Sequence, residues 1–359
     1  MDHATKTEIT LGQQIAPPML DWYDQHRRHL PWRHDPDVKA NPYYVWMSEI
    51  MLQQTTVATV KSYFEKFTNL WPDISDMANA PLEDILQEWA GLGYYARARN
   101  LHKCAQSIMQ DFNGQFPETE AELLTLPGIG PYTAAAIASI AFNQRAVVVD
   151  GNIERVMSRV FKSYAELPKE RAEFYRLANL ATPDSRVGDY AQSLMDLGAT
   201  ICTPKSPKCA ICPIQPHCLG KLEAEELPRK APKKIKPTRK GLSLWITTLD
   251  GYLLLERRPE KGLLGKMPGL PGTDWIEGQE PDIDALMRKM QFLPKLEHQL
   301  AEGEAKHTFT HFHLFLSVGK VTLPNTCDLP DNYFWLSLDQ LDEFGLPTVF
   351  KKAVSLAQR

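Results

Sequence analysis

Residues 126–142 read LPGIGPYTAAAIASIAF, and the architecture of the first part of the chain can be predicted outward from them. Gly128 and Gly130 permit backbone conformations with positive φ, and Pro131 suits the first turn of a helix. The Ala-rich run that follows predicts a helix that packs closely against a neighbour. The backbone N–H groups at the start of such a helix point outward and attract an anion.

This stretch is typical of a helix-hairpin-helix turn that binds the DNA backbone. Through Gly128, Ile129 and Gly130 it would contact a phosphate without regard to base sequence. The alternative is an ordinary connection between two helices that binds nothing. A dinucleotide-binding fingerprint is excluded, because the third glycine is absent and no strand precedes the turn.

Two acidic residues on either side of the hairpin are candidates for catalysis. Glu49 lies in VWMSEIMLQQTTVATV (45–60), and Asp150 ends a run of three valines in VVVDGNIERVMSRV (147–160). Taken alone, Glu49 could lie on a solvated helix face, and Asp150 or Asn152 could cap a helix. Two carboxyl groups on separate helices bordering one cleft would instead suit glycosidic chemistry. One would protonate the leaving group, and the other would stay ionised against an oxocarbenium ion.

Four of the six cysteines lie within CTPKSPKCAICPIQPHC (202–218), with the spacing C-x6-C-x2-C-x5-C. They are Cys202, Cys209, Cys212 and Cys218. Four thiolates in one short loop can surround a tetrahedral zinc ion or an iron–sulfur cluster. Zinc ribbons usually carry two separated CxxC pairs, and this loop has one, so the spacing favours iron–sulfur. Cys104, at helical spacing in NLHKCAQSIM, is expected to be a small core residue.

Length and composition set the limits of the fold. The chain has 359 residues, 43% of them apolar and 23% charged, which predicts a globular protein of two to three domains. A disordered chain, a collagen-like repeat and a coiled-coil rod are excluded. The start, MDHATKTEIT, has no basic or apolar region of the kind found in secretory signals. No membrane span is expected.

The net charge of −4 is unevenly distributed along the chain. Residues 1–218 carry −5, residues 219–240 carry +5 and residues 241–359 carry −4. The middle segment is short, basic and poor in large apolar residues, so we expect a linker that either lies along DNA or is simply solvated. Before it, apolar residues recur at helical spacing and predict an all-α region. After it, runs such as LSLWITTL and GYLLLERR predict strands of a smaller α/β domain.

Together, the hairpin, the VVVDGNIERV segment and the cysteine loop resemble the iron–sulfur helix-hairpin-helix DNA glycosylases. Further segments resemble the adenine-specific family within that group: LPWR, SEIMLQQTTVATV, GLGYYARARNL, AQSLMDLGATICTPKSPKCAICP and KHTFTHFHL. The resemblance covers nearly the whole chain and is most specific up to residue 220. It implies a helical core over residues 1–218, with one lobe at about 36–149 and a cluster-bearing lobe formed by 1–35 and 150–218. It also implies one 4Fe-4S cluster on the four cysteines.

The resemblance also implies an activity: hydrolysis of the N-glycosidic bond of adenine mispaired with 8-oxoguanine or guanine in double-stranded DNA. The adenine would be flipped out of the duplex. Glu49 would protonate it, Asp150 would stabilise the sugar cation, and Asn152 and Tyr132 would orient these groups. Related bifunctional lyases carry a Lys at position 132. Tyr cannot form a Schiff base there, so we expect a monofunctional enzyme.

The remaining family positions concern base recognition. Trp32, Arg33 and Gln192 match positions that line the adenine pocket, although Trp32 alone would suggest core packing. On the lesion strand the matching residues are Gln54, Thr55, Leu92 and Tyr94. Tyr94 would be the stacking wedge, with Tyr95 as the adjacent alternative.

Residues 241–359 resemble a MutT-like, Nudix-fold domain that helps to recognise 8-oxoguanine. The family's Phe-Ser-His loop reads Phe309-Thr310-His311 here, and Thr310 keeps the hydroxyl. The segment DIDALMRKMQF (282–292) lacks the acidic cluster of a Nudix box, so recognition without pyrophosphate hydrolysis is expected.

Three other functions remain open from the sequence. They are an endonuclease III-like glycosylase for oxidised pyrimidines, a non-catalytic lesion-binding protein and a zinc-loop nucleic-acid adaptor. Tyr132 and the additional C-terminal domain disfavour the first, and the presence of both Glu49 and Asp150 disfavours the second. We expect a monomer acting on DNA in a bacterial cytoplasm, associated with the nucleoid and with no membrane.

Overall fold

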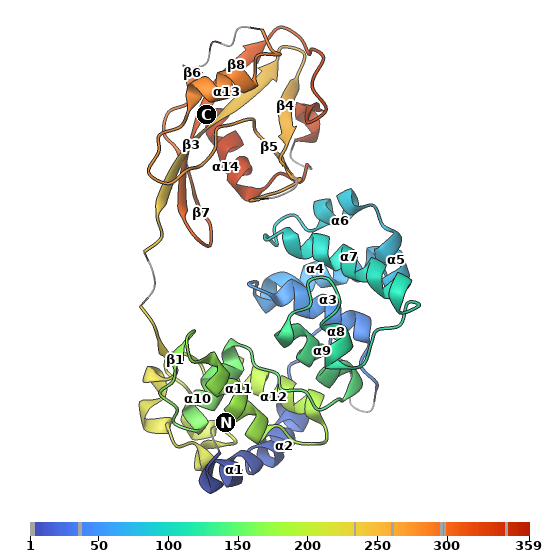
Figure 1. Ribbon diagram of the computed structural model, residues 1–359, viewed down its shortest axis with the longest axis vertical. Helices are drawn as coiled ribbons and strands as arrows, with labels where there is room; N and C mark the ends of the chain where they lie inside the picture. The colour runs from blue at the N-terminus through green and yellow to red at the C-terminus, as the bar shows by residue number, and fades with distance from the viewer. Residues whose placement is uncertain are drawn as a thin grey trace. The chain divides into compact units, whose positions relative to one another are not determined.

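The computed structural model of the chain (Figure 1) describes residues 4–34, 38–232, 235–259, 262–294, 297, 299–341 and 344–359. It divides into two compact units: Met1–Leu82 with Ala96–Pro232, and Glu83–Tyr95 with Lys233–Arg359. Within the described part of the chain, no helix has the length and apolar character needed to cross a lipid bilayer.

The first unit is helical, as the sequence predicts. Its α-helices are α1 (Lys6–Gln13), α2 (Ala16–His26), α3 (Pro42–Leu52), α4 (Val57–Leu70), α5 (Ile74–Asn79), α7 (Ala96–Asp111), α8 (Glu120–Leu123), α9 (Pro131–Phe142), α10 (Gly151–Val160), α11 (Arg171–Ala181) and α12 (Val187–Thr200). Helix α6 (Leu82–Glu88) begins at the boundary with the second unit. Three short 3-10 helices follow: η1 (Cys209–Ile211), η2 (Gln215–His217) and η3 (Lys221–Glu226).

The helices of the first unit pack in two groups. Helix α3 packs against α4, α7 and α9, and α8 packs against α9. In the other group α1 packs against α11, α2 against α12, and α10 against both α11 and α12 (Figure 1). Helices α9 and α12 join the groups, and their close approach needs Gly188, where an added Cβ would lie 2.6 Å from the Ser139 carbonyl oxygen. The N-terminal helices thus lie beside the helices that follow residue 150.

The basic segment 219–240 differs from the expected linker at both ends. Its first part folds onto the first unit: Leu227 is buried, and β2 (Arg229–Lys230) pairs in parallel with β1 (Glu166–Leu167). From Thr238 onward the chain already belongs to β3 of the C-terminal sheet. The apolar anchor Leu227 and the β-pairing explain why a segment so rich in charge is ordered there.

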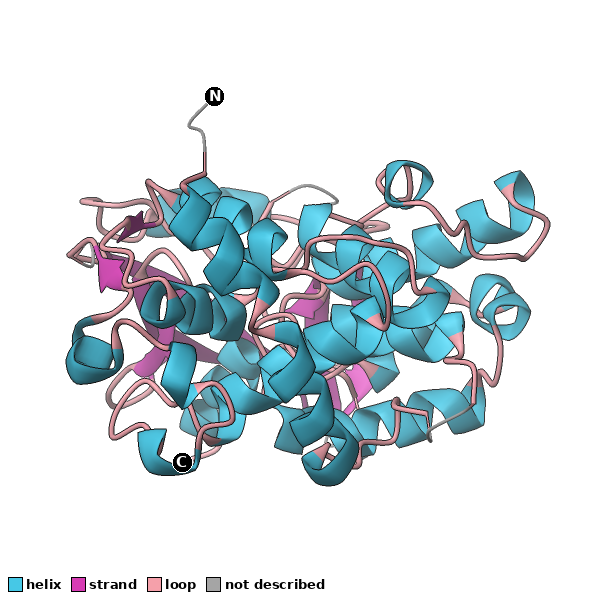
Figure 2. Ribbon diagram, turned by 90° about the horizontal axis from the view of Figure 1, so that it is seen from below, coloured by secondary structure: helices cyan, strands magenta, loops and turns pink. Residues whose placement is uncertain are grey.

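The second unit contains a seven-stranded mixed sheet. Its strands are β3 (Thr238–Thr248), β4 (Tyr252–Arg257), β5 (Pro268–Gly269), β6 (Gln299–Leu300), β7 (Ala305–Thr308), β8 (His313–Leu323) and β9 (Tyr333–Ser337). The order is β5-β4-β3-β8-β6, with β7 also paired to β8 and β9 to β4. Strands β3 and β8 run parallel from the pair Thr238–His313 to the pair Thr248–Leu323. Figure 2 draws the strands in magenta. Among the described residues, the strands of the first unit are β1 and β2.

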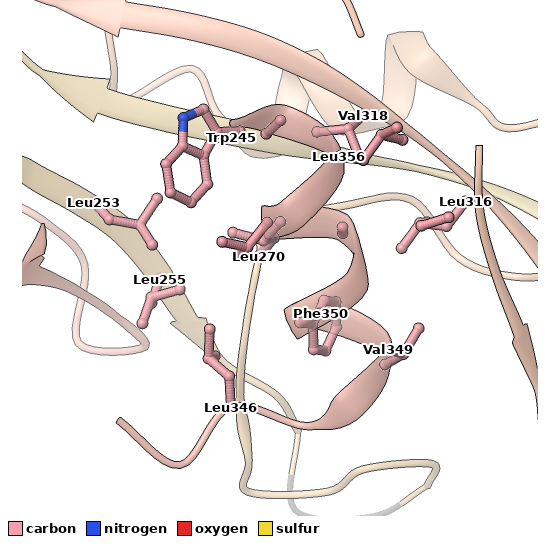
Figure 3. Packing of buried hydrophobic residues seen from close by; sticks show 14 of the residues in the cluster. Trp245, Leu253, Leu255, Leu270, Leu316, Val318, Leu346, Val349, Phe350 and Leu356 are labelled. Atoms are coloured by element: carbon pink, nitrogen blue, oxygen red, sulfur yellow. The ribbon is translucent and has the colours of Figure 1, made fainter. Parts of the chain in front are cut away.

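Helices cover both faces of this sheet because side chains alternate along β3. Leu242, Leu244 and Ile246 pack in one cluster with Leu286 of α13 (Ile283–Lys289). Trp245 lies in the opposite cluster with Phe350 of α14 (Thr348–Ala357). Figure 3 shows this cluster, in which Leu253 and Leu255 of β4 and Leu316 and Val318 of β8 belong to the sheet. The predicted α/β domain is therefore present, and α13 and α14 are its helices on the two faces of the sheet.

Candidate active site

Glu49 is buried in α3 and bonded to Tyr132. Asn41 caps this helix and Pro42 occupies its first turn, so Glu49 falls in its last two turns, among buried neighbours. The Glu49 side chain accepts a hydrogen bond of 2.7 Å from the hydroxyl of Tyr132, the second residue of α9. Burial raises the pKa of Glu49 to about 7. The hydrogen bond from Tyr132 and the charge of Arg33 lower the pKa, and the negative charge of Asp150 raises it. The solvated-face interpretation is therefore excluded.

Asp150 caps α10, and its charge also raises the pKa of Glu49. One carboxylate oxygen accepts from the backbone N–H groups of Asn152, at 3.0 Å, and Ile153, at 2.7 Å. The other accepts from the Asn152 side-chain amide at 2.8 Å. Burial raises the pKa of Asp150, and these hydrogen bonds oppose the rise. The Asp150 carboxyl group therefore caps α10, and it is also placed where it can act together with Glu49.

Arg155 fixes the orientation of the Asn152 amide. Its guanidinium donates to the Asn152 side-chain oxygen at 2.8 Å, so the amide nitrogen faces Asp150. The same guanidinium donates to the carbonyls of Gly198, at 2.6 Å, and Cys202, at 2.7 Å. A continuous set of hydrogen bonds therefore joins Asp150 to the start of the cysteine loop.

The three residues predicted to line an adenine pocket are all buried. Trp32 packs edge-on against Phe64, with ring centroids 5.4 Å apart, so its packing role is present whatever its contact with a base. Gln192 lies on α12, with its amide nitrogen 3.4 Å from the Gly188 carbonyl oxygen. Of the three residues, Arg33 is the one whose positive charge lowers the pKa of Glu49.

The hairpin has the backbone geometry expected of an anion site. Gly128 has a φ of +78°, and a Cβ there would lie 2.6 Å from the Asn100 Cβ, so the position requires glycine. Gly130 precedes α9 as its N-cap, and a Cβ there would meet nothing within 4 Å. Ile129 is buried and holds the turn against the core. Gly130 is half-buried, and the space that a side chain would occupy there is open.

Two of the residues predicted to meet the opposite strand have left-handed backbones. Gln54, with a φ of +59°, follows the end of α3. Arg97 braces this turn: it donates to the α3 carbonyl oxygens of Ile50, at 2.9 Å, and Met51, at 3.0 Å, and to the Thr55 hydroxyl at 3.3 Å. These contacts hold the backbone that presents Gln54 and Thr55.

The second left-handed residue is Tyr94, with a φ of +49°. It is 49% exposed, whereas its neighbours Leu92 and Tyr95 are buried. Of the two tyrosines, Tyr94 therefore keeps the larger part of its surface exposed. Sequence alone left Tyr94 and Tyr95 as alternatives.

In the second unit the Phe309–Phe312 turn connects β7 and β8. The Phe309 N–H donates to the Phe312 carbonyl at 2.9 Å, and the two rings lie 4.8 Å apart. Phe309 also packs against His307 and Trp275. Thr310 and His311 at the tip are exposed, and the Thr310 hydroxyl is 2.7 Å from the Tyr94 hydroxyl. Two residues predicted on separate grounds to face the lesion strand are thus in contact.

The four loop cysteines line one cavity together with apolar side chains of α10 and α12, among them Val156 and Leu197. Among the described residues, no three His, Cys, Asp or Glu side chains converge as a single metal ion requires. An all-thiolate set spread around one apolar cavity fits a cluster of several metal atoms better than zinc. When bound, a cluster would cross-link the loop through Cys202, Cys209, Cys212 and Cys218.

Arg159 is expected to be essential for cluster retention. It is buried, lies 3.2 Å from the Cys202 sulfur, and donates to the carbonyls of Thr203, Pro204 and Leu227. We predict that Arg159→Met lowers the iron content and visible absorbance of the purified protein several-fold. Arg171→Met, which removes an arginine paired with Glu154 at the surface, is the matched control. Full iron occupancy in the Arg159 variant would contradict the prediction.

Sequence reasoning did not single out Arg97, Arg155, Arg159 or Asp196. Arg155 and Arg159 lie one helical turn apart on α10, facing the cysteine loop, and that spacing was a usable signal. Asp196 lies one turn after Gln192 on α12, and its side chain is fully buried. Arg97 donates to the backbone carbonyls of Ile50 and Met51, and such contacts leave no trace in a sequence pattern.

Comparison with known proteins agrees with this arrangement. Residues 47–180 match the HhH-GPD superfamily base excision DNA repair proteins, residues 202–218 the iron-sulfur binding domain of endonuclease III, and residues 243–356 the NUDIX domain. The solved structure of a thermostable thymine-DNA glycosylase is 29% identical, with a TM-score of 0.52, over 60% of this chain and 98% of that chain. The fold and site define a base-excision DNA glycosylase core with an iron–sulfur loop and a Nudix domain.

The full-length relatives narrow this class. The adenine DNA glycosylase of Homo sapiens is 34% identical over 95% of this chain and 73% of its own length. That of Buchnera aphidicola (subsp. Baizongia pistaciae) is 34% identical over 94% of this chain and 95% of its own. The chain belongs to the adenine DNA glycosylase family.

Proposed function

We propose that this protein is a monofunctional glycosylase that removes adenine paired with 8-oxoguanine, or with guanine, from double-stranded DNA. The observation that carries the proposal is the buried Glu49–Tyr132 pair within electrostatic reach of Asp150. A carboxyl group with a pKa of about 7 is protonated in a substantial fraction of molecules at neutral pH. It can therefore supply the proton that an adenine leaving group requires.

The reaction then proceeds as follows. The adenine is flipped out of the duplex, and Glu49 donates its proton to a ring nitrogen of the base. The bond between the sugar C1′ and the base nitrogen breaks, and its electron pair leaves with the adenine. The ionised Asp150, held by Asn152, stabilises the positive charge at C1′ until a water oxygen bonds to C1′ and the water gives up its proton, which restores the protonated Glu49. Tyr132 keeps Glu49 in place through its hydroxyl.

Recognition of the opposite base is assigned to Tyr94, Thr310, His311 and the Gln54–Thr55 turn. The Tyr94–Thr310 hydrogen bond supports this assignment, because it places a stacking ring and a hydrogen-bonding hydroxyl together. Phe309 anchors the loop rather than reading the base. Gly130 and its neighbours in the hairpin would bind a backbone phosphate. We further propose that the protein acts as a monomer in a bacterial cytoplasm, at the nucleoid; of this, the match to the Buchnera enzyme supports the bacterial setting.

The test is a single-turnover assay on duplexes with adenine opposite 8-oxoguanine, guanine or thymine. We expect free adenine from the first two, faster with 8-oxoguanine, and none from the third. Because position 132 is Tyr, borohydride should trap little or no enzyme on the DNA. A duplex containing an oxidised pyrimidine is the control for the endonuclease III-like alternative. Absence of adenine release, or a strong trapped adduct, would refute the proposal.

A further inference from the structure

Asp196 lies beside the candidate site, and its carboxylate accepts more hydrogen bonds than that of Glu49 or Asp150. It lies on α12 with a fully buried side chain. It accepts four hydrogen bonds: from the Arg28 backbone N–H (3.0 Å), the Arg28 Nε (2.5 Å), and the Arg33 Nη1 (2.6 Å) and Nη2 (2.8 Å). All four donors belong to the segment between α2 and α3.

This geometry ties the segment between α2 and α3 to helix α12. Arg33 is engaged end-on and bidentately, and its guanidinium also lies over the Tyr23 ring, 5.9 Å from the centroid. Trp32 lies between the two arginines, on the same segment. Gln192 lies one turn earlier on the helix that carries Asp196. One carboxylate therefore sets the positions of Arg33 and Trp32 relative to Gln192.

The pair also has an electrostatic consequence. Burial alone would raise the pKa of Asp196, but the hydrogen bonds and charges of Arg33 and Arg28 outweigh it and hold the pKa below its usual range. Asp196 is thus an anion that offsets the Arg33 cation. Glu49 is faced by Tyr132 from α9, by Asp150 from the start of α10 and by Arg33. Removing the Asp196 charge would leave Arg33 as an uncompensated cation beside Glu49.

We propose that Asp196 is a positioning residue of the adenine pocket, which fixes the Arg33 guanidinium and the Trp32 segment against the helix of Gln192 and offsets the Arg33 charge. This inference rests on the proposed function, because it assumes that Arg33 and Glu49 act on a flipped adenine. It assigns Asp196 no contact with the DNA.

The experiment is the pH dependence of single-turnover adenine release by Asp196→Asn. Asn keeps the shape and one acceptor but loses the charge, so Glu49 should give up its proton at lower pH. If the midpoint of the pH–rate profile falls by about one pH unit, the rate of adenine release at pH values above the midpoint falls about tenfold. The affinity for DNA should change little. Asp189→Asn is the matched control, since Asp189 lies on the same helix and pairs with the exposed Arg186.

A second variant separates position from charge. Asp196→Glu retains the anion but moves it by one methylene, so the midpoint should stay in place while the rate falls. This variant also carries the test if Asp196→Asn does not fold. The proposal is overturned by a wild-type rate and midpoint in Asp196→Asn, by an equal loss at every pH, or by a wild-type rate in Asp196→Glu. A wild-type enzyme that releases no adenine refutes the proposed function instead.

Discussion

Glu49→Gln should abolish adenine release and at the same time stabilise the folded protein above neutral pH. The glutamine oxygen can still accept from Tyr132, so the local structure is retained, but the amide has no acidic proton to donate. Loss of a general acid costs roughly 10²–10⁴ in rate. Single-turnover release of adenine measures this loss. A variant that keeps more than a tenth of the wild-type rate would contradict the assignment of Glu49 as the acid.

The pH dependence follows from the raised pKa of Glu49. The protonated form is the active one, so the wild-type rate should fall as pH rises through about 7. Stability changes in the same direction, because between pH 4.5 and about 7 the unfolded chain releases a proton that the folded chain retains. Above that range the buried anion costs about 3 kcal/mol of unfolding free energy. Glu49→Gln removes this cost.

Thermal unfolding at pH 5 and pH 8 checks this stability change. Glu154→Gln is the matched control, because Glu154 is equally buried but is ion-paired with Arg171, so its replacement should not stabilise the protein. A melting temperature of Glu49→Gln that does not exceed the wild-type value at pH 8 would show that Glu49 carries no desolvation cost.

Asp150→Asn should be nearly as severe, without loss of the fold. Asn is as good a helix cap as Asp, so the hydrogen bonds from Asn152 and Ile153 to one side-chain oxygen can persist. The charge that would stabilise the sugar cation is lost. Removing one preorganised electrostatic group of this kind costs roughly 10²–10³ in rate. DNA binding should be retained, because no phosphate contact is removed.

The matched control for this variant is Asp73→Asn. Asp73 caps α5 in the same manner, accepting from the N–H groups of Ser75 and Asp76, but lies at the surface. Its replacement should leave adenine release unchanged. Single-turnover rates and circular dichroism of both variants decide the matter: equal activity of the two would mean that Asp150 is only a cap.

Much of the fold could be predicted from local sequence. Gly128 and Pro131 specify a turn and a helix start, and the apolar run in 242–249 specifies a strand, because these properties depend on neighbouring residues. The close relation of Glu49 to Asp150 could not be derived in this way. They are a hundred residues apart, and only the packing of α3 against α9 and the cap of α10 bring them together.

The bounds of the linker could not be predicted from composition. Composition predicted a linker throughout 219–240, yet a single buried leucine, Leu227, and two backbone pairs are enough to order its first half. The choice between Tyr94 and Tyr95 was similarly beyond the sequence. The two side chains differ in exposure, since Tyr94 has a left-handed backbone and is half exposed while Tyr95 is buried.

Helix α3 carries Glu49 and ends in the turn of Gln54 and Thr55, which Arg97 holds to the last carbonyls of the helix. The proposed acid for one strand lies on α3, and the turn proposed to meet the other strand follows directly after that helix, about one and a half helical turns further along the chain. An opposite base that displaces the turn must displace the acid as well. Discrimination between mispairs should therefore appear in the first-order rate constant of the bound complex, so that a poor partner base is bound but left unprocessed.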